Sequence, residues 1–299
     1  MQPMNRGVVY ALLAFCTWGL YPLYFVHLKS VHALEIVLHR ALWSLLFVAL
    51  LLLVLRRWRW LADVWHQPQQ LGVYALSAML ISANWLLYVW AVANGQVLQA
   101  SLGYFINPLF SVALGMLVLH EKLRRAQWLA VAFAGAGVLW LTFAAAHPPW
   151  VALSLAALFA LYGLVRKTAR LGALEGLTLE TALMAIPALP LLLWWTLQHD
   201  GALLRGDTTL TLWLALAGPL TVLPLVCFAA AARRLPLATV GVLQYLSPTL
   251  QFMLGVWVFG EAFDATRLLG FGLIWLGLAV YSVDALRLRF TSVAVAPPG

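Results

Sequence analysis

The sequence predicts an all-α, polytopic membrane protein of ten transmembrane helices, because of its composition, its long apolar segments and the distribution of its positive charges. Of its 299 residues, 64% are hydrophobic and only 9% are charged, against roughly 25% charged in a soluble domain. Apolar segments of about 20 residues, the length that crosses ~30 Å of hydrocarbon, recur along the chain. The short alternating segments of a transmembrane β-barrel are absent.

Ten apolar segments can be delimited, separated by short connections with turn-forming residues. No soluble domain fits between them, and the first segment is interpreted as an uncleaved membrane helix rather than a signal peptide. The predicted spans are residues 7–26, 34–55, 72–93, 98–119, 127–144, 150–165, 177–197, 210–232, 238–259 and 268–284.

The Lys and Arg residues sort to one side of this arrangement. Short loops rich in these residues stay in the cytoplasm. With a cytoplasmic N-terminus, only Lys29, Arg205 and Arg267 of the 18 Lys and Arg residues fall outside, and Arg40 lies within a helix. The others, including the Arg166–Lys167 pair after the sixth segment, fall inside. We therefore predict ten spans with both termini cytoplasmic, and the net charge of +8 is a topology signal that needs no nucleic-acid partner.

An internal repeat appears when the chain is shifted by 140 residues. Pro108 then falls on Pro248, Gly115 on Gly255, Glu121 on Glu261 and Gly137 on Gly277, without a gap. The repeat unit contains five predicted helices, and because five is odd the second copy enters the membrane inverted. We expect a first repeat over residues 1–146 and a second, with a short C-terminal tail, over 147–299. Inverted repeats are typical of secondary transporters, whose substrates bind near the midplane between the halves; duplication retained for packing alone is the alternative.

Two polar helix faces lie at equivalent positions of the repeat. Spacings of three and four residues place each set on one helix face, beside a proline that is expected to kink the helix and free a backbone carbonyl. These faces predict a substrate pocket between the halves, or else hydrogen bonds that hold helices together. The residues are Tyr104, Asn107 and Ser111 beside Pro108, and Gln244, Ser247 and Gln251 beside Pro248.

Polar residues of the second and third segments are further candidates for the same pocket. Arg40 lies about 9 Å into its span at ~1.5 Å per residue, where a cation is a functional candidate unless it reaches the outer surface. Trp43, Asn84 and Tyr88 are additional candidates for substrate contact. Glu35 and His39, four residues apart, are candidates for carrying protons, although a membrane histidine is more often structural.

Other function classes find no support in the sequence. The catalytic motifs of membrane enzymes are absent, so we predict no enzyme activity and no cofactor. The spacing of Cys16 and Cys227 predicts neither a disulfide nor a metal site. A lipid-translocating or structural membrane protein remains the alternative to a transporter, because a lipid also needs a polar groove.

Several motifs carry a family resemblance that covers nearly the whole chain. The five-plus-five plan, with Asn/Ser-Pro followed by Gly-x5-Glu in the fourth and ninth segments, resembles the EamA branch of the drug/metabolite transporter superfamily. Within it, the chain is similar to RarD-type permeases, also called chloramphenicol-sensitive proteins. The most specific match is Gly103-Tyr104-Phe105-Ile106-Asn107-Pro108, with Glu35-Ile36, His39-Arg40, Trp43-Ser44, Asn84-Trp85 and Gln244-Tyr245-Leu246-Ser247-Pro248 in support.

The resemblance implies a multi-pass permease of the bacterial inner membrane that works by alternating access. The expected partners are a small organic metabolite or drug and the lipid bilayer. An ion gradient is a candidate driving force, since the chain has no nucleotide-binding domain. The sequence settles neither the substrate nor the direction of transport.

Overall fold

The computed structural model describes residues 5–56, 58, 60–65, 68–94, 97–143, 149–198, 201–260 and 265–294, with the backbone alone at 62–63, 65, 68, 92–93, 97–101, 267 and 285–294. The regular structure within these ranges is helical throughout. The elements are α1 (Arg6–Gly19), α2 (Tyr21–Phe25), η1 (Val26–Leu28), α3 (Ala33–Leu55), α4 (Trp60–Trp65), α5 (Pro68–Ala93), α6 (Val97–Leu117), α7 (Arg125–Phe143), α8 (Trp150–Thr168), α9 (Ala173–Gln198), η2 (Ala202–Arg205), α10 (Thr208–Ala232), α11 (Leu237–Gln244), α12 (Leu246–Trp257) and α13 (Ala265–Ala294).

Most of these helices are long and apolar enough to cross a membrane. Counting α1 to η1 as one span, seven described helices meet this standard: Arg6–Leu28, α3, Gln69–Ala91 of α5, α7, α8, α9 and α10. Two shorter apolar stretches, Leu102–Leu117 and Leu268–Asp284, lie in α6 and α13. The segment predicted at 238–259 is divided into α11 and α12 at Tyr245. The all-helical prediction is thus confirmed, and the count of ten spans stays a prediction.

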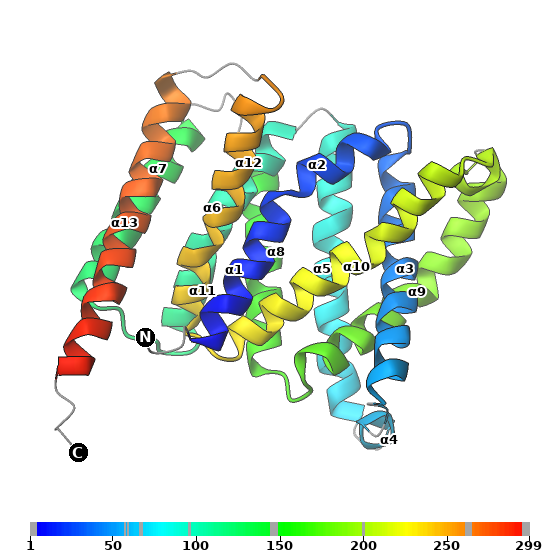
Figure 1. Ribbon diagram of the computed structural model, residues 1–299, viewed down its shortest axis with the longest axis horizontal. Coiled ribbons are helices and arrows are strands. Elements are labelled where there is room, and N and C mark those ends of the chain that lie inside the picture. The colour runs from blue at the N-terminus through cyan, green and yellow to red at the C-terminus, as the bar shows by residue number, and fades with distance from the viewer. Residues whose placement is uncertain are drawn as a thin grey trace.

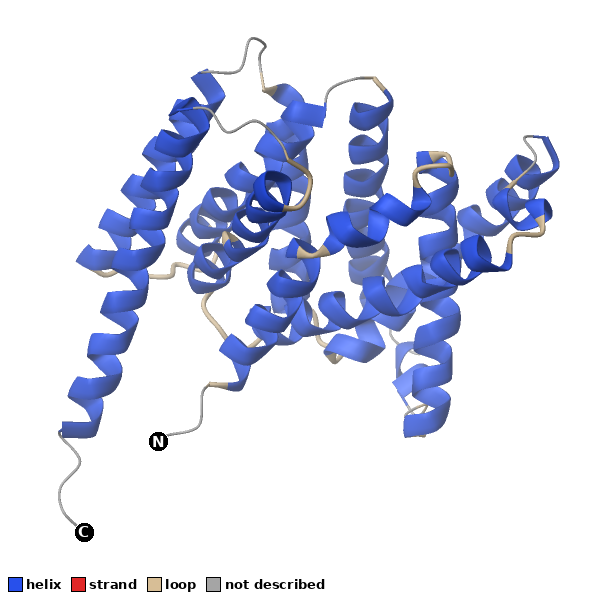
Figure 2. Ribbon diagram, turned by 45° about the horizontal axis from the view of Figure 1, so that its top comes forward, coloured by secondary structure: helices blue, strands red, loops and turns tan. Residues whose placement is uncertain are grey.

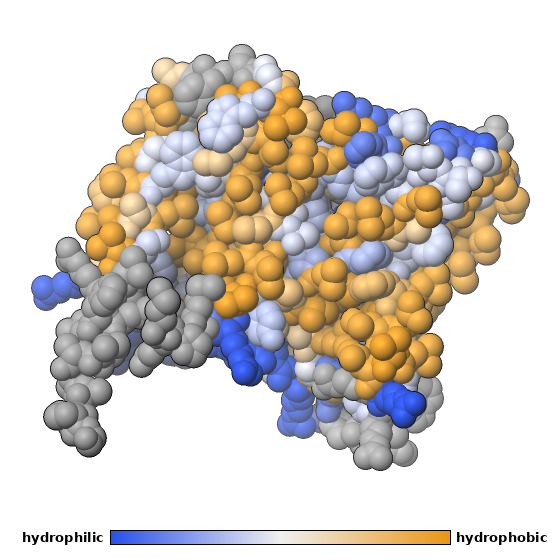
Figure 3. Space-filling model, in the orientation of Figure 1, coloured by the Kyte–Doolittle hydropathy of each residue, from blue (hydrophilic) through white to orange (hydrophobic). Residues whose placement is uncertain are grey.

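The outer surface of the bundle is apolar. Large hydrophobic side chains such as Ile186 (70% exposed) and Phe143 (83% exposed) face outwards, and apolar atoms cover most of the flanks in Figure 3, with hydrophilic atoms gathered towards the two ends. Exposed apolar surface of this extent marks contact with lipid rather than water.

The helices form a bundle with a paired edge. At one edge α7 and α13 pack against each other, in the centre lie α1, α6, α8 and α11–α12, and α3, α5, α9 and α10 form the other side (Figures 1 and 2). The start of α1 and the end of α13 lie at the same end of the bundle, which also carries α4 (Figure 1).

Helix contacts occur in pairs that match across the repeat. Helix α1 packs on α10 and α12, while α8, which occupies the corresponding place in the second half, packs on α5 and α6. Helices α3 and α9 contact each other, as do α6 and α11. Each contact therefore has a counterpart when the two halves are exchanged.

The paired α7 and α13 show the same reciprocity at single residues. A Cβ added at Gly137 would lie 2.5 Å from the Gly270 carbonyl oxygen, and one added at Gly277 would lie 2.6 Å from the Ala130 carbonyl oxygen. Residues 130 and 270, like 137 and 277, are 140 positions apart. Such exchange of partners is what a two-fold relation produces, and the two helices run in opposite directions (Figure 1).

Candidate functional site

Arg40 lies inside the bundle and contacts a hydroxyl group and an aromatic ring. Its Nε donates a hydrogen bond to Thr221 Oγ1 of α10 at 3.2 Å, and its guanidinium carbon lies 4.3 Å from the centre of the Trp85 ring of α5. No Asp or Glu among the described residues lies within ion-pair distance of it. A cation in a membrane interior costs ~2.5–3.5 kcal/mol on insertion scales. The ring contributes ~0.5–2 kcal/mol, so the remaining cost can be offset by a bound anion or by water.

Four tyrosines interact electrostatically with this cation. They are Tyr21, Tyr24, Tyr88 and Tyr104. Tyr21 donates to the Leu220 carbonyl and Tyr24 to the Trp213 carbonyl. These two bonds fix the α1–α2 end of the span against α10.

Tyr88 and Tyr104 remain available to a ligand. Their ring centres are 6.0 Å apart, and their hydroxyls make no hydrogen bond to any residue that the structure describes. Tyr104 lies four residues before Pro108 in α6, and its side chain is 38% exposed. The surroundings of Arg40 thus offer cationic, aromatic and hydroxyl groups to one solute.

The other polar residues predicted for the pocket divide into two kinds. Asn84 Nδ2 donates to the Leu155 carbonyl at 3.0 Å, and Gln251 Nε2 donates to the Trp18 carbonyl at 3.0 Å. Ser247 Oγ donates to the Phe15 carbonyl at 2.7 Å. These three side chains already connect neighbouring helices, as the alternative interpretation expected.

Asn107 and Gln244 differ from them. They are 2% and 5% exposed, and their amide oxygens, Asn107 Oδ1 and Gln244 Oε1, accept no hydrogen bond from any residue that the structure describes. Both lie where α6 crosses α11, close to Gly241, whose added Cβ would lie 2.7 Å from the Pro108 carbonyl oxygen. A buried acceptor without a partner costs ~1–3 kcal/mol, so these two oxygens are suited to a hydrogen-bond donor that binds there.

The two prolines have different effects on their helices. Helix α6 continues through Pro108, whereas the second polar segment is broken at Tyr245, three residues before Pro248. Proline lacks the N–H that would bond four residues back, at Tyr104 and at Gln244. The break therefore lies where the missing bond leaves the helix weakest.

Glu35 and His39 lie near the N-terminal end of α3. Glu35 Oε1 accepts a hydrogen bond from Ala202 N of η2 at 2.6 Å, and His39 Nε2 lies 3.7 Å from the same oxygen, too far for a hydrogen bond. Glu35 thus anchors the connection between α9 and α10. A proton-carrying role for Glu35 and His39 stays a prediction. Trp43 packs where Gly218 allows α10 to approach α3, and its contact with a substrate also stays a prediction.

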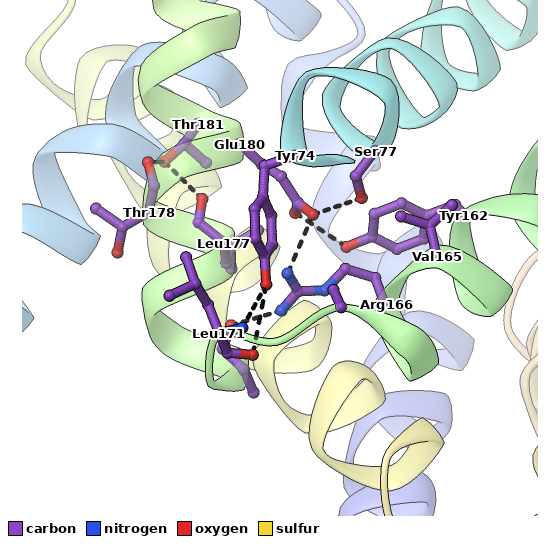
Figure 4. A network of polar contacts seen from close by, with 12 residues as sticks. Tyr74, Ser77, Tyr162, Val165, Arg166, Leu171, Leu177, Thr178, Glu180 and Thr181 are labelled. Carbon is purple, nitrogen blue, oxygen red and sulfur yellow. Dashed lines mark hydrogen bonds and ion pairs between the residues drawn. The ribbon is translucent and has the colours of Figure 1, made fainter. Parts of the chain in front are cut away.

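A buried ion pair escaped the sequence interpretation. Arg166, assigned above to an inside loop, lies in α8 with 1% of its surface exposed and pairs with Glu180 of α9. Figure 4 shows this pair with Ser77, Tyr74 and Tyr162 around it. The loop assignment of Arg166 is wrong because the carboxylate of Glu180 allows the charge to be buried in the last turn of the helix.

The repeat itself contains a signal for this pair. Ala33-Leu34-Glu35 recurs as Ala173-Leu174-Glu175, again 140 residues on, and the same shift takes Arg40 to Glu180. Arg40 bonds to a hydroxyl on α10, and Glu180 accepts from Ser77 on α5. Opposite charges thus occupy equivalent positions of the two repeats.

The Gly-x5-Glu motif has a structural cause. Glu121 Oε1 accepts from Leu237 N at 2.7 Å and Oε2 accepts from Ala238 N at 3.0 Å, at the start of α11. An added Cβ on Gly115 would lie 2.6 Å from Glu121 Oε2, so the glycine makes room for the carboxylate. His120 before it has φ +55°, and Gly260, 140 residues on, has φ +66°. Glu261 lies outside the described residues.

Comparison with known proteins identifies the class. The model of the EamA-like transporter family matches residues 5–143 and again 149–283. The chain belongs to this family, and it is a multi-pass membrane transporter. The resemblance predicted from the Gly103–Pro108 stretch is confirmed.

Among its relatives, an uncharacterized transporter of Pseudomonas aeruginosa is 50% identical over 288 residues, covering 95% of both chains. Protein RarD of Streptomyces exfoliatus is 48% identical over 283 residues, covering 95% of this chain and 90% of the relative. A solved crystal structure superposes with a TM-score of 0.72 at 19% identity, covering 94% of this chain and 98% of the other; this likeness shows the fold alone.

Proposed function

We propose that the protein is a secondary transporter of the bacterial inner membrane that moves a small organic solute by alternating access between two inverted five-helix halves. The environment of Arg40 is the main support for this proposal. Arg40 is a cation within the membrane region and has no acidic partner among the described residues. It lies beside Trp85, Tyr88 and Tyr104. A solute with an anionic group and an aromatic or apolar body would pair its charge with Arg40 and pack its body against the aromatic rings.

The inverted arrangement is supported by three observations. The offset of 140 residues relates the reciprocal glycine contacts of α7 and α13, and also the left-handed residues His120 and Gly260. The family model matches once in each half, at residues 5–143 and 149–283. Five spans in each half give ten, which puts both termini on the same side of the membrane, and the excess of Lys and Arg on that side favours the cytoplasm. The relatives are bacterial, which supports the inner membrane as the location.

The substrate site draws on both halves. Arg40, Tyr88, Tyr104 and Asn107 come from the first, and Thr221 and Gln244 from the second. A solute held between halves can be exposed to either side when the halves rock about it. This arrangement suits transport, whereas a structural protein would have no use for the unpaired acceptors of Asn107 and Gln244.

The test is binding followed by flux. The purified protein is screened against a metabolite collection for ligand-dependent thermal shift, and each hit is measured for entry into proteoliposomes. We expect organic anions among the hits and saturable flux above that of protein-free liposomes. Flux of labelled phospholipid instead of solute would favour lipid translocation, and hits without any flux would contradict the transporter.

A further inference from the structure

The ion pair between Arg166 of α8 and Glu180 of α9 contains a carboxylate that is fully buried. Glu180 is 0% exposed. Its Oε1 accepts from Ser77 Oγ at 2.5 Å and from Arg166 Nη1 at 3.2 Å, and its Oε2 accepts from Tyr162 Oη at 3.3 Å. Figure 4 shows these three donors converging on the carboxylate.

The network joins the two halves of the chain. Glu180 belongs to α9 and Arg166 to α8, while Ser77 and Tyr74 belong to α5 of the first half. Tyr74 Oη accepts from Leu171 N at 2.9 Å, and its ring centre lies 5.6 Å from the Arg166 guanidinium. The Ser77–Glu180 and Tyr74–Leu171 bonds therefore hold the halves together at this end.

Arg166 does not depend on Glu180 alone. Its Nη2 donates to the Ala173 carbonyl at 2.8 Å, and the Tyr74 ring lies beside it. A proton on Glu180 would therefore not leave the guanidinium bare, although removing one partner of a buried pair usually costs ~3–5 kcal/mol. The neutral carboxyl would carry its own O–H donor and no charge, so the charge-assisted bond from Arg166 would weaken, and Ser77 or Tyr162 would have to turn its hydroxyl to accept or lose its bond.

Resting on the function proposed above, we infer that Glu180 is the proton-binding site that couples transport to the proton gradient, and that its protonation releases α5 from α8 and α9. The proton comes from water and binds a carboxylate oxygen; no other bond is formed or broken covalently. Glu35 is less suited to this task because its carboxylate holds the backbone of η2.

The other charged and titratable groups that act on Glu180 come from α5 and α8, and Glu35, His39 and Arg40 lie on α3, which also packs against α9. Tyr74 faces it from α5, Tyr162 and Arg166 face it from α8, and Glu175 lies on its own helix. Arg233, after α10, acts on Tyr74 and donates to the Leu171 carbonyl. Tyrosines and arginines titrate far above neutral pH, so a proton taken up on acidification binds to a carboxylate.

The first experiment uses the proton itself as probe. Infrared difference spectra of the purified full-length protein, recorded while the pH is lowered, should show the carbonyl band of a buried protonated carboxyl group. We expect the band in the wild type and also in the control variant Asp284→Asn. Asp284 is a suitable control because its Oδ2 also pairs with an arginine, Arg124 Nη2, at 2.7 Å. It should be missing in Glu180→Gln. An unchanged band in Glu180→Gln would overturn the inference.

A second experiment measures release of the helices. Leu177, on α9 one turn from Glu180, is 3% exposed. All labelling rates are expressed relative to that of a free thiol at the same pH, because the thiolate is the reactive form. In a background with Cys16 and Cys227 replaced by Ser, we expect the relative maleimide rate of Leu177→Cys to be several-fold higher at acidic than at neutral pH. With Glu180→Gln added, the fast rate should hold at both pH values. Equal, slow labelling rates at both pH values and in both proteins would contradict release. Ser77→Ala provides a milder variant, because it loses only the Ser77–Glu180 hydrogen bond.

The inference and the proposed function fail differently. A wild-type protein that moves solute into proteoliposomes, but shows neither the infrared band nor pH-dependent labelling, would be a transporter without this proton site. With an imposed pH gradient, Glu180→Gln should lose solute accumulation while keeping solute exchange across the membrane. Loss of both activities together would show a structural role for Glu180 and overturn the coupling.

Discussion

Two buried asparagines allow the binding and packing roles of polar residues to be separated by one substitution. Asn84 (8% exposed) donates to the Leu155 carbonyl at 3.0 Å, whereas Asn107 (2% exposed) has an amide oxygen without a partner. Hydrogen bonds between membrane helices contribute ~0.6–1.7 kcal/mol, so Asn84→Leu should lower the free energy of unfolding by about that amount. Asn107→Leu removes an unsatisfied acceptor, so stability should stay unchanged or rise.

Solute binding should show the opposite pattern. If the solute donates to Asn107 Oδ1, the Asn107→Leu variant should lose ~1–3 kcal/mol of binding free energy, about 5- to 150-fold in affinity, while Asn84→Leu binds normally. Unfolding is measured by denaturing-detergent titration in micelles, and affinity by thermal shift with the solute found in the flux screen. Equal losses of stability in both variants, with affinity unchanged, would refute the assignment of Asn107 to the site.

Three further predictions follow from the fold. Lys29→Cys should react with an impermeant thiol reagent added outside intact cells, and Lys122→Cys should not; labelling of position 122 would contradict the ten-span topology. Gly137→Ala should destabilise the protein by ~1–3 kcal/mol because its Cβ would meet a backbone oxygen, while Gly135→Ala, with open space around it, should not lower the melting temperature. Glu121→Gln should lower the free energy of unfolding by ~1–2 kcal/mol because a charged acceptor is lost from two backbone N–H groups; an unchanged value would exclude a capping role.

The helices themselves were predictable because length and apolarity are local properties. Their ends were less so. Helix α8 runs to Thr168 because Arg166 is buried against Glu180, and an arginine near a predicted helix end gives no sign of a partner in the next helix. The break at Tyr245 follows from the bond that Pro248 cannot make, but Pro108 in the same context leaves α6 continuous.

The sequence pointed to Arg40, Tyr88 and Tyr104 as site residues, but it did not point to Thr221. Arg40 is recognisable because a single cation in an apolar segment is costly. Its partner Thr221 is 181 positions away, and a threonine in an apolar helix is too common to signal a site. Polarity alone also could not separate Asn107 from Gln251, because only the packing of α12 on α1 brings the Trp18 carbonyl to the glutamine.

Recognition of the transported solute by Arg40 is the central feature of the proposed transporter. The decisive measurement is saturable uptake into proteoliposomes of an organic anion from the screen and of its neutral amide analogue, by the wild type and by Arg40→Leu. We predict that Arg40→Leu loses uptake of the anion and leaves any uptake of the neutral analogue unchanged, since a cation in a low-dielectric site acts mainly on opposite charge. Uptake of the anion at the wild-type rate by Arg40→Leu would contradict the account.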